Sequence, residues 1–239
     1  GRDQDVWDHC ARQVEALAGE GTVLVFLPGV GEIERLRERL SVAMPVQVLH
    51  GRLAGDAQAA VLEAPSGPRV VLATNVAETS VTIEGVTVVV DSGLERRPSY
   101  DPRRHRSRLV TRRISQANAE QRAGRAGRQA PGVAYRLWSE TEQQRLQVHS
   151  EPEILQSDLS ALVLQCLQWG SSPEALLWLD APPPAHCEQA LALLKTCGAV
   201  DEGAAALSLP EHGEAMARLP LPPRLAHMLL HGHALGVAE

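Results

Sequence analysis

The sequence contains a single lysine, Lys195, and that lysine stands in LLKTC rather than in a glycine-rich turn. A P-loop requires the pattern GK[ST] after such a turn, because its lysine reaches the β- and γ-phosphates of a bound nucleotide. This chain therefore cannot supply a P-loop of its own. Nearly all of its positive charge comes from arginine.

Clustered metal ligands are also missing from the sequence. No two of the four cysteines have CxxC spacing, and no HExxH occurs. His231 and His233 lie two positions apart, which suits helical chelation poorly. We expect no metal site, and we expect buried thiols rather than zinc ligands or disulfides at the four cysteines, which are Cys10, Cys166, Cys187 and Cys197.

Long apolar runs are absent as well. No stretch approaches twenty uninterrupted apolar residues, and the first thirty residues show no secretory signal pattern. With 44% hydrophobic, 22% charged and 3% aromatic residues, the composition is that of a globular protein. We expect a cytoplasmic protein that does not associate with a membrane.

Positive charge is concentrated in one segment. Residues 96–128 hold eleven arginines against Asp101 and Glu120, a balance of +9, so the remainder carries −15 of the total charge of −6. A basic segment on an acidic protein is typical of polyanion binding, and it also fits a solvated basic surface.

Strand-like and helix-like segments alternate up to about residue 90. The runs TVLVFLPG, VQVLHG, PRVVLATN and VTVVVD read as strands, and helical patterns separate them. This alternation predicts an α/β fold with a parallel sheet covered by helices and a ligand at the carboxyl ends of the strands. Residues 99–114 then predict a β-hairpin, residues 115–124 a helix, and GVAYRLW a last strand.

From about residue 150 the pattern is helical. One amphipathic helix is expected over EILQSDLSALVLQCLQW, ended by Gly170, followed by a short helix at Ser172-Pro173 and a third in CEQALALLKTCGAV. With AALSL as a short strand, these elements suggest a winged-helix module. The last thirty residues begin another helical unit without an evident end, so we expect a truncated chain.

Two short stretches have the composition of phosphate-contacting segments. ATNVAETS, at 73–80, leaves a strand with small, hydroxyl and amide side chains, although Thr-Asn after a strand is more often a turn or a helix cap. In QRAGRAGR, at 121–128, glycines alternate with arginines three positions apart. Guanidinium groups present a planar fork to phosphate oxygens, so this stretch predicts either a catalytic arginine finger or a basic surface helix.

The order of these stretches resembles the second RecA-like domain of the DEAH-box branch of superfamily two helicases. FLPGVGEIERL is similar to motif four of that family, ATNVAETSVTI to motif five, and QRAGRAGR to motif six. VVDSGLER resembles the strand and turn that follow motif five. SEPEIL, LDAPP and EQALALLKTCGAVDE resemble the winged-helix module, and the pairing of QWG with LDAPP is most similar to the bacterial HrpB-type members.

The resemblance implies a domain order. Residues 1–145 would form the second RecA-like domain, an α/β parallel sheet with a projecting β-hairpin. Residues 146–209 would form the winged-helix domain, and residues 210–239 the start of a ratchet-like helical bundle.

The resemblance also implies a nucleotide site. Gln121 would orient or sense the γ-phosphate end of ATP, Arg125 and Arg128 would neutralise charge that develops during phosphoryl transfer, and Arg122 would organise the motif. Three further residues would contact or report on the nucleotide. Ser80 would report its state, and Thr82 and Glu84 would lie near the ribose, where the family often has Asp in place of Glu84.

The resemblance implies single-stranded RNA as the partner, bound mostly through its backbone. Thr74 and Asn75 would contact that backbone, and the hairpin from about Tyr100 to Arg113 would meet the RNA at one end of its path. The arginines expected to contribute from the hairpin are Arg103, Arg104 and Arg112.

Two features depart from complete family members. Val61 and Leu62 stand in the helix where many relatives place an aromatic residue that stacks on adenine, so we expect loose base preference. The chain also lacks a DEAH-like acidic motif. The ligands of Mg²⁺ and the P-loop would come from a first RecA-like domain of the same parent protein, and the chain alone is predicted to be inactive. A non-catalytic nucleic-acid or partner-binding module and a DNA-directed helicase are the alternative functions.

Overall fold

The computed structural model describes residues 2–19, 21–63, 67–79, 81–101, 106–128, 131–201 and 208–237, without the side chains of residues 2–5, 106 and 107. The chain divides into two compact units. Unit 1 comprises residues 1–97 and 110–150, and unit 2 comprises residues 98–109 and 151–239. The predicted boundaries at 145 and 209 stay a prediction.

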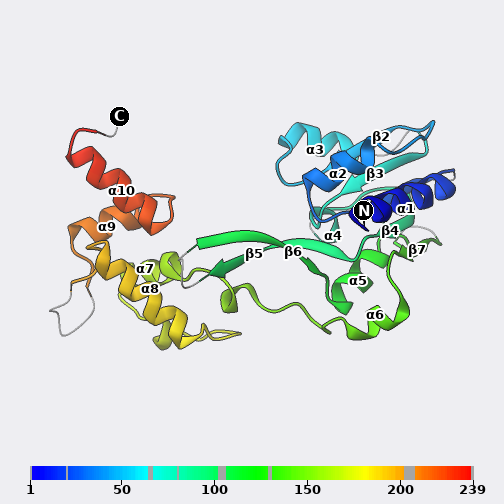
Figure 1. The fold of residues 1–239 in the computed structure, drawn as a ribbon. Coiled ribbons are helices and arrows are strands. Elements are labelled where there is room, and N and C mark those ends of the chain that lie inside the picture. Colours follow the sequence, from blue (N-terminus) through cyan, green and yellow to red (C-terminus); the bar gives the residue numbers. More distant parts are fainter. Residues whose placement is uncertain are drawn as a thin grey trace. The chain divides into compact units, whose positions relative to one another are not determined.

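Unit 1 contains a five-stranded parallel sheet, which confirms the predicted fold class (Figure 1). The strand order is β2-β3-β1-β4-β7, so the chain crosses over between neighbouring strands. These strands are β1 (Thr22–Phe26), β2 (Val46–Leu49), β3 (Arg69–Ala73), β4 (Val86–Asp91) and β7 (Val133–Arg136).

The register aligns the carboxyl ends of the inner strands. Phe26 pairs with Ala73 on one side and with Asp91 on the other, and Leu49 also pairs with Ala73. Segments that leave β1, β3 and β4 therefore start at the same edge of the sheet. This is the edge where ligands bind in open parallel sheets.

Helices cover both faces of the sheet because strands buried on both sides present alternate residues to each face. The two central strands β1 and β3 are buried at every position. On one face, α1 and α2 pack against Val23, Val25 and Leu72, whereas Leu24 and Phe26 contribute to the core on the other face. The helices of unit 1 are α1 (Arg2–Leu17), α2 (Val30–Arg37), α3 (Gly55–Leu62), α4 (Val76–Thr79), α5 (Gln116–Ala123) and α6 (Glu140–Arg145).

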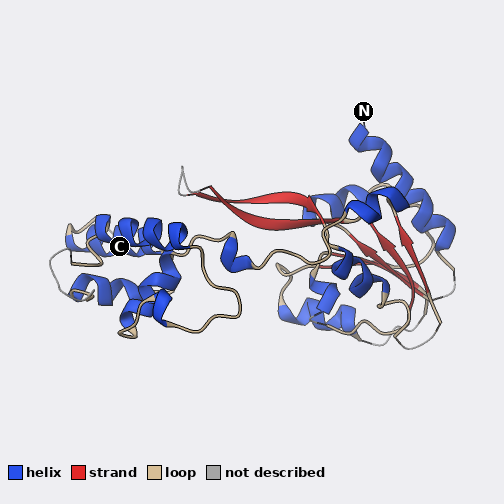
Figure 2. Ribbon diagram, turned by 90° about the horizontal axis from the view of Figure 1, so that it is seen from below, coloured by secondary structure: helices blue, strands red, loops and turns tan. Residues whose placement is uncertain are grey.

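A separate two-stranded ribbon follows β4 (Figure 2). It consists of β5 (Leu94–Asp101) and β6 (Arg106–Arg113), which confirms the predicted hairpin and starts it five residues earlier than the expected residue 99. The residues at the base of both strands belong to unit 1 and those nearer the turn to unit 2.

From residue 151 onward, the regular elements in the described part of unit 2 are all helical. Its helices pack around a core that includes Leu164, Leu194 and Met216. The elements are the 3-10 turns η1 (Glu153–Leu155) and η2 (Pro173–Ala175) and the helices α7 (Ser160–Gln168), α8 (Pro184–Thr196), α9 (Glu211–Ala217) and α10 (Pro223–Ala234).

Several details of unit 2 differ from the sequence-based expectations. The prediction of a single helix over 153–169 is wrong, because η1 ends at Leu155 and the separate helix α7 begins at Ser160. Between them, Asp158 Oδ1 accepts the N–H of Ser160 at 2.8 Å. Such a side-chain bond competes with continued helix. Gly170 ends α7 with a positive φ of 76°, as predicted. Ser172 and Pro173 open only a 3-10 turn, and the Ser172 hydroxyl does not cap it.

The strand expected at AALSL lies mostly outside the described residues. Ser208 and Leu209, its described part, are not in a strand. The winged-helix assignment therefore stays a prediction. Within the described ranges, no helix is both long enough and apolar enough to span a bilayer.

Candidate nucleotide and nucleic-acid site

The segment after β3 turns immediately at the carboxyl edge of the sheet. Thr74 continues the sheet bonding, with its N–H donating to the carbonyl of Leu49 at 3.1 Å. The carbonyl of Asn75 then accepts the N–H of Glu78 at 2.9 Å within the short helix α4. Asn75 is exposed at this edge, and Thr74 is partly exposed. Ser80 lies outside the described residues.

The arginine-glycine stretch begins on α5 and continues beyond it. Ser115 caps this helix by accepting the N–H of Asn118 at 3.1 Å. Gln121 and Arg122 belong to the helix, which ends at Ala123, and Arg125 and Arg128 lie in the turns that follow. Gln121 is exposed. The expected helix at 115–124 is thus confirmed, but only one of the three arginines is helical.

Arg122 is a buried organising residue. Its side chain is 1% exposed, and its Nε donates to Glu78 Oε2 at 3.0 Å. Its Nη1 donates to Asp91 Oδ1 at 2.9 Å and to the carbonyl of Leu94 at 3.2 Å. One guanidinium therefore ties α5 to the segments that follow β3 and β4.

Arg125 lies against the backbone of the segment after β3. The residue is 8% exposed, and its Nε donates to the carbonyl of Glu78 at 2.9 Å. Its Nη1 donates to the carbonyl of Val81 at 2.5 Å, and its Nη2 also donates to the carbonyl of Glu78. Burial lowers the pKa of the Arg125 guanidinium, and the like charge of Arg128 lowers it further.

Arg128 is exposed and approaches the same segment farther along. Its Nη1 donates to Thr82 Oγ1 at 3.1 Å, although the two residues are 46 positions apart. Glu84 is exposed two residues later, and its carbonyl accepts the Thr22 hydroxyl at 3.4 Å. The structure thus brings Arg128 to Thr82 and Arg125 to the neighbouring Val81.

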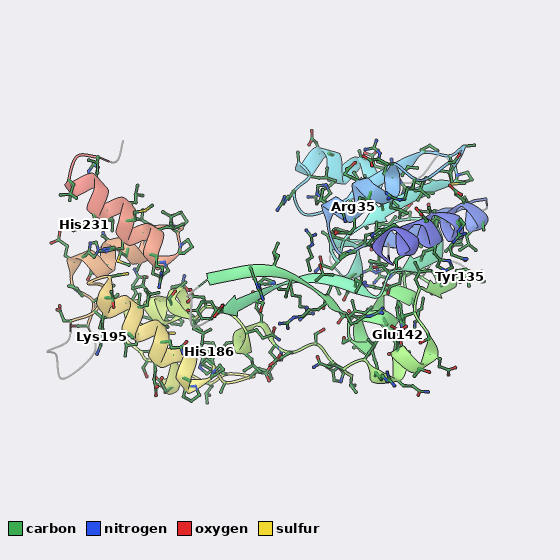
Figure 3. All side chains as sticks on the ribbon, viewed as in Figure 1. Arg35, Tyr135, Glu142, His186, Lys195 and His231 are labelled. Carbon is green, nitrogen blue, oxygen red and sulfur yellow. The ribbon has the colours of Figure 1, made fainter. Side chains whose placement is uncertain are left out.

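The hairpin carries the other predicted arginines. Arg112 lies on β6 and is exposed, whereas Arg103 and Arg104 lie outside the described residues. Ion pairs on both strands join the base of the hairpin to the helices α2 and α6. Arg96 contacts Glu32 at 3.1 Å, and Arg113 contacts Glu142 of α6 at 2.6 Å. Glu142 is labelled in Figure 3.

Three residues of the site escaped sequence reasoning: Glu78, Asp91 and Asn118. The carboxylates of Glu78 and Asp91 are buried and flank Arg122. Burial raises the pKa of the Asp91 carboxyl, while Arg122 and the N–H of Gly93 act in the opposite direction. The sequence did offer one indication of this arrangement. Asp91 ends the apolar run VTVVVD, and a charge buried beside such a strand needs a partner of opposite sign.

Within the described part of the chain, no group of three or more His, Cys, Asp or Glu side chains could hold a metal ion. All four cysteines are buried and free, as expected.

Comparison with protein families places residues 8–130 in the helicase conserved C-terminal domain. The chain is 49% identical to ATP-dependent RNA helicase HrpB of Escherichia coli over 217 residues, which cover 88% of this chain and 26% of that protein. It is 38% identical to ATP-dependent RNA helicase DEAH11, chloroplastic, of Arabidopsis thaliana, over 92% of this chain and 12% of that protein.

Solved structures agree with these relatives. The crystal structure of E. coli DExH-box NTPase HrpB matches 94% of this chain and 28% of that chain with a TM-score of 0.80 at 44% identity. A second crystal structure, of E. coli DEAH/RHA helicase HrpB, matches 94% of this chain and 29% of that chain with a TM-score of 0.84 at 43% identity. The chain thus spans about a quarter of the length of HrpB. With its parallel sheet, its arginine-glycine stretch and its matched residues 8–130, the chain belongs to the helicase conserved C-terminal domain family, in the DEAH-box branch.

Proposed function

We propose that this chain is the second RecA-like domain and the following helical unit of an ATP-dependent RNA helicase. In the intact protein, ATP hydrolysis at the interface with a first RecA-like domain would drive movement on RNA or its unwinding. Family membership and the similarity to HrpB support this function.

The contact between Arg128 and Thr82 is the observation that carries the proposal. Arg128 is exposed and contacts Thr82 in the segment between β3 and β4. A guanidinium in that position suits phosphate oxygens, because it stays charged and presents several N–H donors. Gln121 is exposed on α5 in the same stretch.

Arg125 has a second task in this proposal. Its donors already bond the carbonyls of Glu78 and Val81, so this arginine fixes the turn after β3 and would have to release those carbonyls to reach a phosphate. Arg128 is therefore assigned the primary phosphate contact. ATP supplies the transferable phosphoryl group, and the P-loop lysine and the Mg²⁺ ligands would come from the first RecA-like domain.

The RNA contacts are assigned to the sheet edge and the hairpin. Thr74 and Asn75 offer short polar side chains where β3 ends, and Arg112 adds positive charge on β6. Such contacts reach the sugar-phosphate backbone and carry little sequence information. We therefore expect the affinity for RNA to fall steeply as the salt concentration rises and to depend only weakly on the RNA sequence.

The test is the RNA-stimulated ATPase activity of the intact helicase that contains this sequence, with Arg128→Ala, Arg128→Lys and Arg125→Ala. We expect Arg128→Ala to lower kcat by roughly 10³-fold or more, the effect typical of an arginine finger, while RNA binding is retained. Lysine should restore little, because it lacks the planar fork.

Near-normal turnover in both alanine variants would refute the arginine assignment and favour a non-catalytic binding module. Stimulation by single-stranded DNA equal to that by RNA would instead favour a DNA-directed helicase.

A further inference from the structure

The helix that carries Gln121 and Arg122 starts against the segment that leads out of unit 1. The N–H of Gln116 donates to the carbonyl of Gln147 at 2.8 Å, and the N–H of Ala117 donates to the carbonyl of Val148 at 3.1 Å. The first N–H groups of a helix have no partner within the helix. Residues 147–150 therefore serve as an external cap for α5.

Asn118 extends this attachment with its side chain. Its Oδ1 accepts the hydroxyl of Ser150 at 2.6 Å and also the hydroxyl of Ser115. Its Nδ2 donates to Glu78 Oε1. The orientation of the amide follows from its neighbours, because a carboxylate can only accept and the two hydroxyls can donate.

Glu78 carries the connection on to the arginines. Its Oε2 accepts Arg122 Nε at 3.0 Å, and its main-chain carbonyl accepts Arg125 Nε at 2.9 Å. Glu78 and Arg122 are both buried, so their bonds are little screened by water. A continuous series of hydrogen bonds thus leads from Ser150 through Asn118 and Glu78 to Arg122 and Arg125.

We propose that Asn118 is a positioning residue for the arginine-glycine stretch. Its amide holds Glu78, and through Glu78 the guanidinium of Arg125, at a fixed place relative to residues 147–150. Only an amide of this length offers an acceptor to the serines and a donor to the carboxylate at once. A shift of residues 147–150 would consequently be transmitted to Arg125. The inference rests on the proposed function, which gives Arg125 its role.

The experiment is an exchange of amide and carboxylate in the intact helicase. Asn118→Asp preserves shape but places a second carboxylate against Glu78. We expect it to lower RNA-stimulated kcat by at least roughly tenfold, as when a hydrogen bond to a charged group is lost, with KM for ATP changed less than about twofold. Adding Glu78→Gln restores an amide-carboxylate pair in reverse, so the double variant should recover most of kcat.

Gln144→Glu is the matched control, since it makes the same amide-to-acid change at an exposed residue of α6 and should leave kcat unchanged. If Asn118→Asp lowers the urea midpoint of the protein, Ser150→Ala provides the second measurement. It removes the 2.6 Å bond to Asn118 and a weaker 3.3 Å bond to the Ser115 hydroxyl, and it should lower kcat several-fold with the midpoint preserved.

Normal kcat in Asn118→Asp and Ser150→Ala, or no recovery in the double variant, would overturn the inference while Arg125→Ala remains defective. Full activity of Arg125→Ala would instead refute the role that the proposed function gives to Arg125. The activity of Arg125→Ala therefore distinguishes failure of the inference from failure of the proposed function.

Discussion

The guanidinium carbon of Arg122 lies 4.9 Å from the centre of the Phe26 ring. Phe26 is the last residue of β1, and its ring is fully buried. The cation therefore sits above the end of the central strand, between the carboxylates of Glu78 and Asp91. Attraction between a cation and an aromatic face adds to these ion pairs when water is excluded.

Arg122→Ala should destabilise the protein strongly. The change leaves two buried carboxylates without their cation, and breaking a buried ion pair in this way costs about 3–5 kcal/mol. Urea unfolding of the 239-residue chain measures the effect. Arg145→Ala, at an exposed residue of α6, serves as the control and should change stability by less than about 0.5 kcal/mol. Equal stability of the two variants would contradict the organising role of Arg122.

Gly213→Ala should destabilise unit 2. A Cβ at this buried position of α9 would lie 2.2 Å from the carbonyl oxygen of Ala199, and backbone cannot move aside cheaply. Overpacking of this kind costs about 1–3 kcal/mol. Gly31→Ala is the matched change in α2, where a Cβ meets no atom within 4 Å, and helix propensity should make it stabilising by up to about 1 kcal/mol. Thermal unfolding should separate the two variants in opposite directions.

His212 should make unit 2 sensitive to acid. Burial lowers its pKa, and the neighbouring His227 and His231 lower it further; His227 lies 3.0 Å away. Because the folded pKa lies below the unfolded value of about 6.5, the unfolded chain binds protons first as pH falls. Stability from this residue is present above that pH and is lost below it. The decrease in melting temperature between pH 7.5 and pH 5 should be smaller in His212→Gln; an unchanged decrease would exclude His212 as its source.

RNA affinity should depend steeply on salt, and Arg112 should contribute to that dependence. For single strands the slope of log K against log salt changes by about 0.7 for each phosphate neutralised. Arg112→Ala should reduce the slope by about that amount for every sequence tested. Fluorescence anisotropy with a labelled ten-nucleotide RNA measures it. Arg35→Ala, at an exposed residue of α2, is the control with an equal loss of charge (Figure 3). A slope unaffected by Arg112→Ala would remove the hairpin strand β6 from the RNA path.

The isolated 239-residue chain should not hydrolyse ATP. Its only lysine, Lys195, lies on α8 of unit 2, and no GK[ST] turn occurs in the sequence. Phosphate release from ATP should stay at the background rate with or without RNA. Hydrolysis that persists across preparations and is lost in Arg128→Ala would show that the arginine-glycine stretch acts without a P-loop.

The sheet could be predicted from sequence because its strands are continuous apolar runs. β1 and β3 are buried on both faces, so TVLVF and RVVLA needed no tertiary information to be read as inner strands. The hairpin was predicted from its turn residues, although its early start at Leu94 was not. The break before α7 was missed because apolar periodicity continues through it, while a local bond of Asp158 decides the backbone.

The side-chain partners of the site could be predicted far less well. Arg122 meets Glu78 and Asp91 across 44 and 31 residues of sequence, and only the strand order brings these positions together. The same holds for Arg125, whose partners are backbone carbonyls that no residue type indicates. Charge and spacing could point to the arginines, but their assignment to buried or exposed places required the fold.

The hairpin divides along its length between the two units, so unit 2 is interrupted in sequence: residues 98–109 belong to it although they precede the last 41 residues of unit 1. The N–H of Tyr100 donates to the carbonyl of Gln156, and the Tyr100 ring contacts His186 edge-on at 6.5 Å. No single cut of the polypeptide can therefore yield both halves whole. Protease nicking or domain dissection at residue 150 would deprive the distal hairpin of its supporting residues, and separating the units cleanly would require grafting the hairpin rather than trimming an end.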